Sequence, residues 1–522
     1  MGSHATEVPL TWQHADAAQR AGTRWVANCD EETGRIEVPS VYAPPCVPAF
    51  DPAAPGGNGG ATWGGVTADT IRVAIYQGGA GDVRTALTRT LDTQEQQDET
   101  TDRLAMMLDD LAETYGRHVE LVRFEASGGM DDEVAARADA IRLADEVAPF
   151  AVIGGPPLTT VFAEELAVRG IVCIDCGLAT PDSFHQENAP FIWGPLPTPE
   201  EFLTILGDYL FNRVMGDPAR FAGDPDLRKE GRVLGVVRFE QRIPVFSDLS
   251  RLVTMISEAN GVVPAANEVY TFDLDKMPER ATTIVARMKA AGVTTVLFLG
   301  DPIMPIYLTQ AATAQDYFPE WLVSGTVLTD STVMGRQYDQ RQWAHAFGLS
   351  VLPAKTPVDQ LEAYRLHQWY FGEAPAARGT AQLILNDLVM LFLGIHMAGP
   401  DLRPETFRDG MFGFPASGGG PTTPRVSFGD NRLFIAEDLG TRTDYLAADD
   451  MTEVWWDADA VGPDEVGNEG RGMWRYANGG RRYLPNDMPE QDTDAFREEG
   501  SVLLYEDIPA EDRPPSYPSP RR

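Results

Sequence analysis

Short apolar runs alternate with segments of helical periodicity from Val66 onward, and this alternation leaves few folds open to the chain. The first runs are TIRVAIYQ, VELVRFEA, FAVIGG and IVCID, and predicted helices at 94–115, 133–146 and 159–169 separate them. Short strands that are apolar throughout are typical of parallel sheets with helices on both faces. The sequence therefore predicts an α/β fold built on a parallel sheet.

The alternation restarts after FIWGPLPTPEE, so we expect two similar α/β units in succession. The second unit contains the predicted strands VLGVVRF, EVYTF and TVLFLG and predicted helices at 200–215, 246–260 and 280–291. A long helical segment at 358–399 follows. Beyond Phe414 the composition turns to Gly, Pro, Trp and Asp with little periodicity, and we expect the tail AEDRPPSYPSP to be poorly ordered.

The charge of the chain argues against nucleic acid as a partner. With 42 Lys and Arg against 78 Asp and Glu, the formal net charge is -36, whereas binding to nucleic acid requires clustered cationic residues. Apolar runs stay below about 18 residues, so we expect no membrane-spanning segment. The start, MGSHA, lacks the basic and apolar parts of an export signal, and we expect that a native signal has been removed.

The four cysteines fall into two pairs. Cys29 and Cys46 flank a polar, proline-rich loop that gains little from a packed core, which favours a disulfide and an oxidising compartment. Cys173 and Cys176 form the motif CIDC at a predicted strand end. Buried thiols and a second bridge both remain open for this pair.

The turn GGPPLTT after the strand FAVI has the composition of a ligand-binding edge. Amide groups at the helix start and the hydroxyls of Thr159 and Thr160 are expected to face the crevice beyond the sheet. A phosphate cradle and a nucleophile elbow are disfavoured, because the Walker and G-x-S-x-G patterns are absent and two prolines remove amide donors. Contact with a ligand and simple helix capping by Thr159 both remain open.

A second turn, DCGLATPD, ends the neighbouring predicted strand. Gly177 supplies the bend, while Ala179 and Thr180 offer an amide and a hydroxyl. Cys176 in this turn and Tyr76 at the end of the first strand belong to the same predicted edge. Because two such turns converge, a ligand site is favoured over two separate helix caps.

The second unit ends two of its strands in VVRFEQRIP and FLGDP, which contribute Phe239, Gln241 and Asp301. If the two units face each other, these strand ends line the opposite wall of one cleft. Asp301 across from hydroxyls and helix starts would suit a zwitterion. It can equally be the N-cap of the helix that PIMPIYLTQAA predicts.

Four carboxylates gather around Gly462 in the stretch WWDADAVGPDEVGNEG; they are Asp457, Asp459, Asp464 and Glu465. Their spacing departs from the EF-hand pattern, so we favour a solvated acidic turn over a calcium site. We predict no metal, no cofactor and no catalytic residue.

The order of these segments resembles the type I periplasmic solute-binding proteins, the branched-chain amino acid receptor family of ABC importers. The resemblance covers about residues 66–440 and is carried by GVTADTIRVAIY, VELVRFEASGG, the stretch from FAVIGG to IVCID, GRVLGVVRFE, VTTVLFLGDP and PETFRDGMFGFP. It implies two Rossmann-like lobes joined by three crossing segments, with one ligand between them. A carboxylate seat then falls on Thr159, Thr160, Ala179 and Thr180, and an acidic wall on Asp301.

The chain departs from the family pattern in an insertion after the first strand, in the two prolines of the seat and in both termini. We expect an N-terminal arm at 1–65 and a C-terminal extension at 446–522. Lobe 1 is predicted to comprise 66–197 and 345–412, and lobe 2 to comprise 198–344 and 413–445. The crossings are expected near 194–197, 325–327 and 412–414, where the alternation restarts.

The function that the resemblance implies is binding without catalysis. We expect an extracytoplasmic protein, in the periplasm or at the cell surface, secreted or lipid-anchored, that closes over an amino-acid-like or other small carboxylate. Its partners would be an ABC permease and ATPase, which keep it peripheral to the membrane. A sensing receptor of the same fold is the alternative, and an α/β enzyme is disfavoured because G-x-S-x-G and G-x-G-x-x-G are absent.

Overall fold

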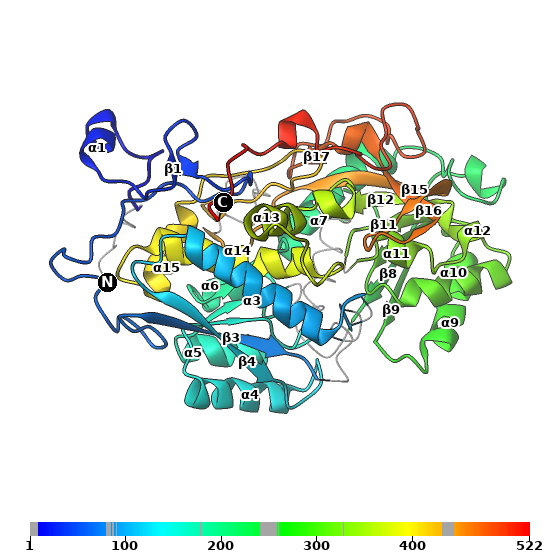
Figure 1. Cartoon of the computed structure of the whole chain (residues 1–522). Coiled ribbons are helices and arrows are strands. Elements are labelled where there is room, and N and C mark those ends of the chain that lie inside the picture. The colour runs from blue at the N-terminus through cyan, green and yellow to red at the C-terminus, as the bar shows by residue number, and fades with distance from the viewer. Residues whose placement is uncertain are drawn as a thin grey trace.

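Two β-sheets form the centres of two lobes in the computed structural model of the chain (Figure 1). The structure describes residues 9–79, 85, 88, 89, 91–177, 180–240, 258, 260–326, 328–430 and 443–521. The predicted two-lobe α/β fold is confirmed. The predicted helix at 246–260 lies outside the described residues except for two positions.

The first sheet has five parallel strands in the order β4-β3-β5-β6-β7. These strands are β3 (Thr70–Gln77), β4 (His118–Glu125), β5 (Ala151–Ile153), β6 (Val172–Ile174) and β7 (Ile192–Trp193). The helices that follow them in sequence are α3 (Gln94–Leu111), α4 (Glu133–Glu146), α5 (Val161–Val168) and α6 (Asp182–Glu187).

Both faces of the first sheet are covered, as the continuously apolar strands predict. In β5, Ala151 and Ile153 join a buried cluster with side chains of α3, whereas Val152 joins a second cluster with side chains of α4 and α5. Figure 1 shows α4 and α5 below this sheet and α3 above it. Successive residues of a strand point to opposite faces, so an apolar strand needs helices on both sides.

Three later helices return to the first lobe: α13 (Glu362–Phe371), α14 (Ala381–Ala398) and α15 (Pro404–Phe412). The predicted helical segment at 358–399 is interrupted because Gly372 ends α13 in the left-handed region, at φ +80°. By length and composition α14 could cross a membrane, but 61% of it is buried, and it packs against α3 and α15 as a core helix. Asp92, in the insertion after β3, caps α14 by accepting the N–H groups of Gly379 and Thr380 at 2.9 and 2.7 Å.

The second sheet has eight strands, with the path β16-β15-β12-β11-β10-β8-β9 and β17 paired to β15. Its parallel strands are β8 (Leu234–Phe239), β9 (Ala266–Tyr270), β10 (Thr295–Leu299), β11 (Glu320–Val323) and β12 (Ala346–Ser350). Its antiparallel strands are β15 (Met451–Pro463), β16 (Glu469–Tyr476) and β17 (Arg482–Tyr483). Its helices are α7 (Pro199–Tyr209), continued by a π-helical segment (Leu210–Val214), α9 (Met277–Ala290), α10 (Met304–Ala314), α11 (Thr332–Gly335) and α12 (Gln340–Trp343).

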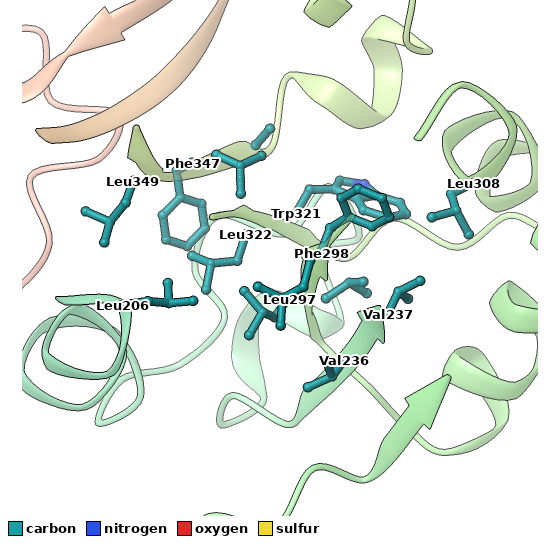
Figure 2. Close-up of a cluster of buried hydrophobic side chains, with 14 of the residues drawn as sticks. Leu206, Val236, Val237, Leu297, Phe298, Leu308, Trp321, Leu322, Phe347 and Leu349 are labelled. Carbon is teal, nitrogen blue, oxygen red and sulfur yellow. The ribbon is translucent and has the colours of Figure 1, made fainter. Parts of the chain in front are cut away.

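Figure 2 shows the core of the second lobe, where apolar side chains of adjacent strands lie next to one another on each face of the sheet. Val236 pairs with Leu297, which pairs with Leu322, and these face Leu206 of α7. The next residues along each strand face the opposite way, toward Leu308 of α10. All of these side chains are at most 2% exposed. Their burial gives this lobe a hydrophobic core independent of that of the first lobe.

The strand pairings correct two predicted boundaries. We assigned 345–412 to lobe 1, but β12 lies beside β11 in the second sheet. We treated 446–522 as an extension, yet β15 extends the second sheet by pairing antiparallel with β12. Backbone pairing with β12 on one side and β16 on the other holds β15 in the sheet, and its Asp- and Trp-rich sequence carries no alternation that would have revealed it.

Crossing segments join the lobes at three places. The first follows β7, where Gly194 forms a parallel bridge with Leu446, and the N–H of Ala447 donates to the carbonyl of Gly194 at 2.9 Å. The return segment from α15 runs beside it through an antiparallel bridge between Val426 and Ala448. The remaining crossing lies between β12 and α13, not at the predicted 325–327, because β12 continues the second sheet.

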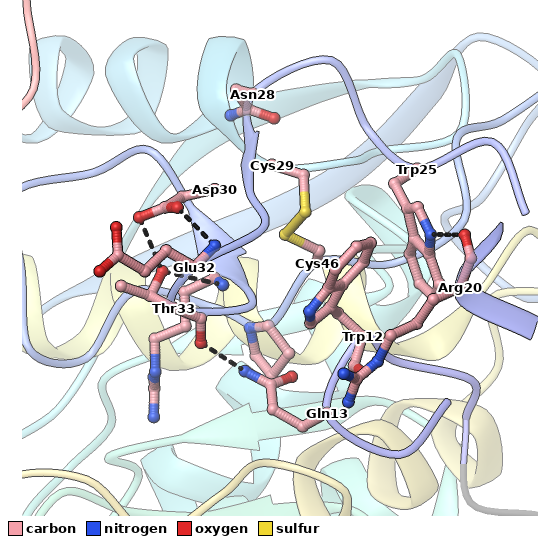
Figure 3. Close-up of a disulfide and its surroundings, with 12 residues drawn as sticks. Trp12, Gln13, Arg20, Trp25, Asn28, Cys29, Asp30, Glu32, Thr33 and Cys46 are labelled. Atoms are coloured by element: carbon pink, nitrogen blue, oxygen red, sulfur yellow. Dashed lines mark hydrogen bonds between the residues drawn. A yellow bond between two sulfur atoms is a disulfide. The ribbon is translucent and has the colours of Figure 1, made fainter. Parts of the chain in front are cut away.

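The N-terminal arm is closed by the predicted disulfide between Cys29 and Cys46, which the structure confirms (Figure 3). The arm contains α1 (Ala17–Gly22) and the short antiparallel strands β1 (Cys29–Asp30) and β2 (Arg35–Ile36). Trp12 and Trp25 pack edge to face with ring centroids 5.3 Å apart. The arm contacts the first lobe through Asn28, whose amide donates to the carbonyl of Leu111 at 3.0 Å.

The C-terminal tail is held by contacts with the crossing segments and with the N-terminal arm, so the expectation of poor order for AEDRPPSYPSP, residues 510–520, is wrong at Asp512 and Tyr517. The N–H of Tyr505 donates to the carbonyl of Lys355, and Asp512, 1% exposed, accepts from the N–H and hydroxyl of Thr422 at 2.6 Å. The hydroxyl of Tyr517 donates to Asp30 at 2.7 Å. These contacts are made by single polar residues in a proline-rich sequence, so they leave no periodic pattern from which an ordered tail could be predicted.

We predict that the arm depends on its disulfide. The variant Cys29→Ala/Cys46→Ala opens a loop with a sequence separation of 17 and should lower the free energy of unfolding by about 3 kcal/mol in urea titrations. The matched control is Cys173→Ala/Cys176→Ala, which opens a bridge with a separation of only 3. A loss no larger than that of the control would contradict the prediction.

Candidate ligand-binding site

The turns after β5 and β6 lie against each other at the carboxyl edge of the first sheet. At Gly155 a Cβ atom would come within 2.8 Å of the carbonyl oxygen of Cys176, so only glycine allows this approach. Tyr76 at the end of β3 packs on Phe162 of α5 with ring centroids 4.8 Å apart. The two predicted turns are therefore brought together, with Tyr76 beside them.

The hydroxyls of Thr159 and Thr160 make local hydrogen bonds at the start of α5. Thr159 Oγ1 accepts the N–H of Val161, the first residue of α5, at 3.2 Å, but the N-cap of α5 is Thr160, and no side chain makes a capping hydrogen bond there. The hydroxyl of Thr160 donates to Glu164 Oε1 at 2.7 Å. Leu158, just before them, packs in the buried cluster of the second lobe, so this turn also contacts the opposite lobe.

Thr180 is hydrogen-bonded to His185, a residue that sequence reasoning did not single out. Thr180 Oγ1 and His185 Nε2 are 2.8 Å apart, and His185 Nδ1 lies 3.2 Å from the carbonyl oxygen of Ile192. His185 is 2% exposed, and burial lowers its pKa to about 4. A histidine five residues after a turn threonine is too common a spacing to have identified this pair.

A cavity of about 20 Å³ lies between these turns and the crossing segments, a volume that suits one water molecule or one small end group. Of the predicted residues Thr160, Cys176, Gly177 and Thr180 line it, together with His185. The structure joins Cys176 to Cys173 in a disulfide, which decides the alternative left open above.

The second-lobe candidates lie in well-packed surroundings. Asp301 lies just before α10 and accepts the N–H groups of Ile303, the N-cap residue, and Met304 at 2.8 and 3.1 Å, and it also accepts the hydroxyl of Tyr270. Burial raises the pKa of Asp301. Phe239 is 5% exposed, with its ring 5.5 Å from that of Tyr270. Ala179 and Gln241 lie outside the described residues.

The four acidic side chains around Gly462 each contact arginine side chains or backbone N–H groups of the protein and do not converge on one point. Asp457 pairs with Arg475 at 2.7 Å, and Asp459 pairs with Arg471. Asp464 accepts backbone N–H groups of its own turn, and Glu465 accepts two N–H groups at the start of α11. Within the described ranges no three His, Cys, Asp or Glu side chains come together as metal ligands.

Three buried carboxyls lie near the crossing segments. Burial, followed by the charge of Asp444, raises the pKa of Glu201 well above its ordinary value. Burial and the neighbouring Asp449 do the same for Asp444. Burial raises the pKa of Asp449 to about 7, although Ser427 donates to it at 2.7 Å. One oxygen each of Asp444 and Asp449 has no hydrogen-bond partner among the described residues.

Comparison with solved structures identifies the fold. A solute-binding protein of an ABC transporter from R. palustris, in complex with 4-hydroxybenzoate, matches with a TM-score of 0.52 at 13% identity, over 81% of this chain and 98% of that chain. One from Rhodopseudomonas palustris HaA2, in complex with p-hydroxybenzoic acid, gives 0.54 at 12% identity over the same shares. An amino acid ABC transporter substrate-binding protein from Pseudomonas fluorescens Pf-5 gives 0.51 at 10% identity, over 78% and 96%.

The chain therefore has the type I periplasmic binding protein fold, as the sequence resemblance implies. At these identities the matches establish the fold alone. No family model and no curated protein sequence matches the chain.

We predict that Asp449 makes the stability of the fold depend on pH. Folding raises its pKa to about 7, so the folded state binds the proton more tightly than the unfolded state. The resulting stabilisation is complete below about pH 4 and is lost as the pH rises to about 7, by up to about 4 kcal/mol. In Asp449→Asn the contribution of this carboxyl to the pH dependence of the free energy of unfolding should disappear, as measured by urea unfolding from pH 4 to 8.

The matched control is Glu320→Gln in the second lobe, because the charge of Asp450, the neighbour of Asp449, itself helps to raise the pKa of Asp449. Glu320 accepts from Arg232 Nε at 2.8 Å, and both side chains are completely buried. Its loss leaves a buried guanidinium without its partner, which should cost about 3 to 5 kcal/mol throughout pH 5 to 8. Identical pH slopes for the wild type and Asp449→Asn would contradict the prediction.

Proposed function

We propose that the chain is the solute-binding protein of an ABC importer and closes over a small organic solute by motion about its crossing segments. The observation that carries this proposal is the convergence of two strand-end turns of a parallel sheet on a cavity that Gly194 and Leu446 of the crossings also line. In open α/β sheets, ligands bind beyond the carboxyl ends of the strands. Two structures of the same fold hold hydroxybenzoate.

The ligand is proposed to lie between the two lobes. Asp301, at the end of β10, would provide a charged group on the second-lobe wall. The first-lobe contacts that we propose are Tyr76, Thr159, Thr160, Cys176, Gly177, Ala179 and Thr180, and the second-lobe contacts are Phe239, Gln241 and Asp301.

Binding without catalysis is the activity that these side chains favour. The pairing of Thr180 with His185 resembles a hydroxyl and its general base, but burial holds the pKa of His185 near 4. A base that weak removes little of a hydroxyl proton at neutral pH. The Nδ1 of His185 is directed at a backbone carbonyl, which orients the ring but does not stabilise an imidazolium as a carboxylate would.

The proposed location is extracytoplasmic, and the proposed partners are a permease and an ATPase of the importer. Two disulfides within the described residues suit an oxidising compartment. The formal charge of -36 opposes binding to nucleic acid. Whether the protein is secreted or lipid-anchored does not affect the binding proposal.

We predict that a panel of small solutes, including L-leucine and 4-hydroxybenzoate, contains at least one that stabilises the protein. A solute at 100 times its Kd should raise the free energy of unfolding by about 2.7 kcal/mol. Scanning calorimetry would detect this change, and small-angle X-ray scattering should show a smaller radius of gyration on binding if the lobes close.

A variant pair tests whether binding occurs at the proposed site. Gly177→Val adds a side chain to the cavity lining, where a Cβ atom makes only ordinary contacts. It should weaken the binding of a solute found in the panel at least tenfold. Gly216→Val is the control, because a Cβ atom there meets no atom within 4 Å. Equal affinity in both variants would place the ligand elsewhere, and the absence of any hit in a broad panel would argue against the proposed function.

A further inference from the structure

The hydrogen-bond directions in the cavity are fixed by atoms that can only accept. The carbonyl oxygen of Ile192 lies 3.2 Å from His185 Nδ1, so Nδ1 must carry the proton of this contact. His185 is almost completely buried, with its ring stacked on Tyr445 at a centroid distance of 6.4 Å and an interplanar angle of 12°. In this apolar setting, which lowers the pKa of His185 to about 4, the ring is neutral at pH 7.

A neutral ring protonated at Nδ1 leaves Nε2 as an acceptor, which orients the hydroxyl of Thr180. At 2.8 Å the hydroxyl must donate to Nε2. Its remaining capacity is that of an acceptor. Thr160, the other hydroxyl in the lining, donates to Glu164 Oε1 at 2.7 Å and is likewise left with lone pairs.

Thr160 and Thr180 both line the cavity, and because each hydroxyl has donated its proton within the protein, it has only lone pairs left for an occupant that reaches it. Among the described residues that line it, none is Lys or Arg. A carboxylate placed against the two hydroxyls would meet oxygen lone pairs without a compensating cation, so only backbone N–H groups of the turns would be left to bind it.

We infer that the first-lobe end of the cleft binds a hydrogen-bond donor of the solute, an ammonium or hydroxyl group, and not its carboxylate. This inference rests on the proposed function and reverses the seat that the family resemblance implies at Thr160 and Thr180. His185 is a positioning residue in this account, because it sets the direction of the Thr180 hydroxyl without touching the solute.

Two matched sets of probes separate donor from carboxylate recognition. The first is L-leucine, 3-methylbutylamine, which lacks the carboxylate, and 4-methylpentanoate, which lacks the ammonium. The second is 4-hydroxybenzoate, p-cresol and 4-methylbenzoate. In calorimetric titrations of the wild type, the member that keeps only the donor should bind at least tenfold more tightly than the member that keeps only the carboxylate.

Variants link this preference to the hydroxyls. Thr180→Val should weaken the binding of the donor-only probe at least tenfold. The control is Thr101→Val, which removes a hydroxyl that donates to the carbonyl of Gln97 in α3 and should leave the binding of this probe unchanged. His185→Phe keeps an aromatic ring but allows Thr180 to donate, so the preference should shift at least tenfold toward the carboxylate. If His185→Phe does not fold, Glu164→Ala makes the same test at the Thr160 hydroxyl.

The protonation of His185 can be measured without a solute. In NMR spectra of protein with ¹⁵N-labelled histidine, His185 should show a protonated Nδ1 and an unprotonated Nε2 at pH 7. A charged ring, or the opposite tautomer, would overturn the inference while leaving the proposed function intact. Tighter binding of the carboxylate-only probes would do the same, and failure of every probe to bind would count against both proposals.

Discussion

The backbone bridge between Gly194 and Leu446 is the contact on which the arrangement of this molecule depends. It joins two segments that are far apart in sequence and that both pass between the lobes. A Cβ atom at Gly194 would come within 2.9 Å of the Leu446 side chain, so the bridge requires glycine or a displaced leucine. Because both residues also line the cavity, motion of the crossings and the shape of the proposed site are physically coupled.

Buried charge is handled differently in the lobes and at the crossings. In the second lobe, Arg213 pairs with Glu453 and Arg232 with Glu320, each at 2.8 Å and with side chains completely buried. Near the crossings, Glu201 and Asp444 are buried with no such partner among the described residues, and burial raises the pKa of each. Paired charges hold a core together over a wide pH range, whereas protonated carboxyls stabilise it only while they keep their protons.

The C-terminal tail adds contacts outside the crossings that connect the lobes. The strands β15, β16 and β17 that precede the tail belong to the second sheet. The hydroxyl of Tyr517 contacts the N-terminal arm, and the Tyr517 carbonyl accepts from Trp369 of α13 at 2.9 Å. Closure over a solute therefore has to preserve these contacts or displace them.

The sequence by itself determined the two α/β units, because continuously apolar strands require helices on both faces, and it determined the pairing of Cys29 with Cys46. It also placed the turns around Thr160 and Thr180 at one sheet edge, since parallel strands end together. Only the tertiary structure decided that β12 and β15 extend the second sheet, because the parallel pairing of β12 with β11 and the antiparallel pairing of β15 with β12 are made by backbone hydrogen bonds, which leave no pattern in the sequence. It likewise decided the direction of the Thr180 hydroxyl, which depends on where the carbonyl of Ile192 lies relative to His185.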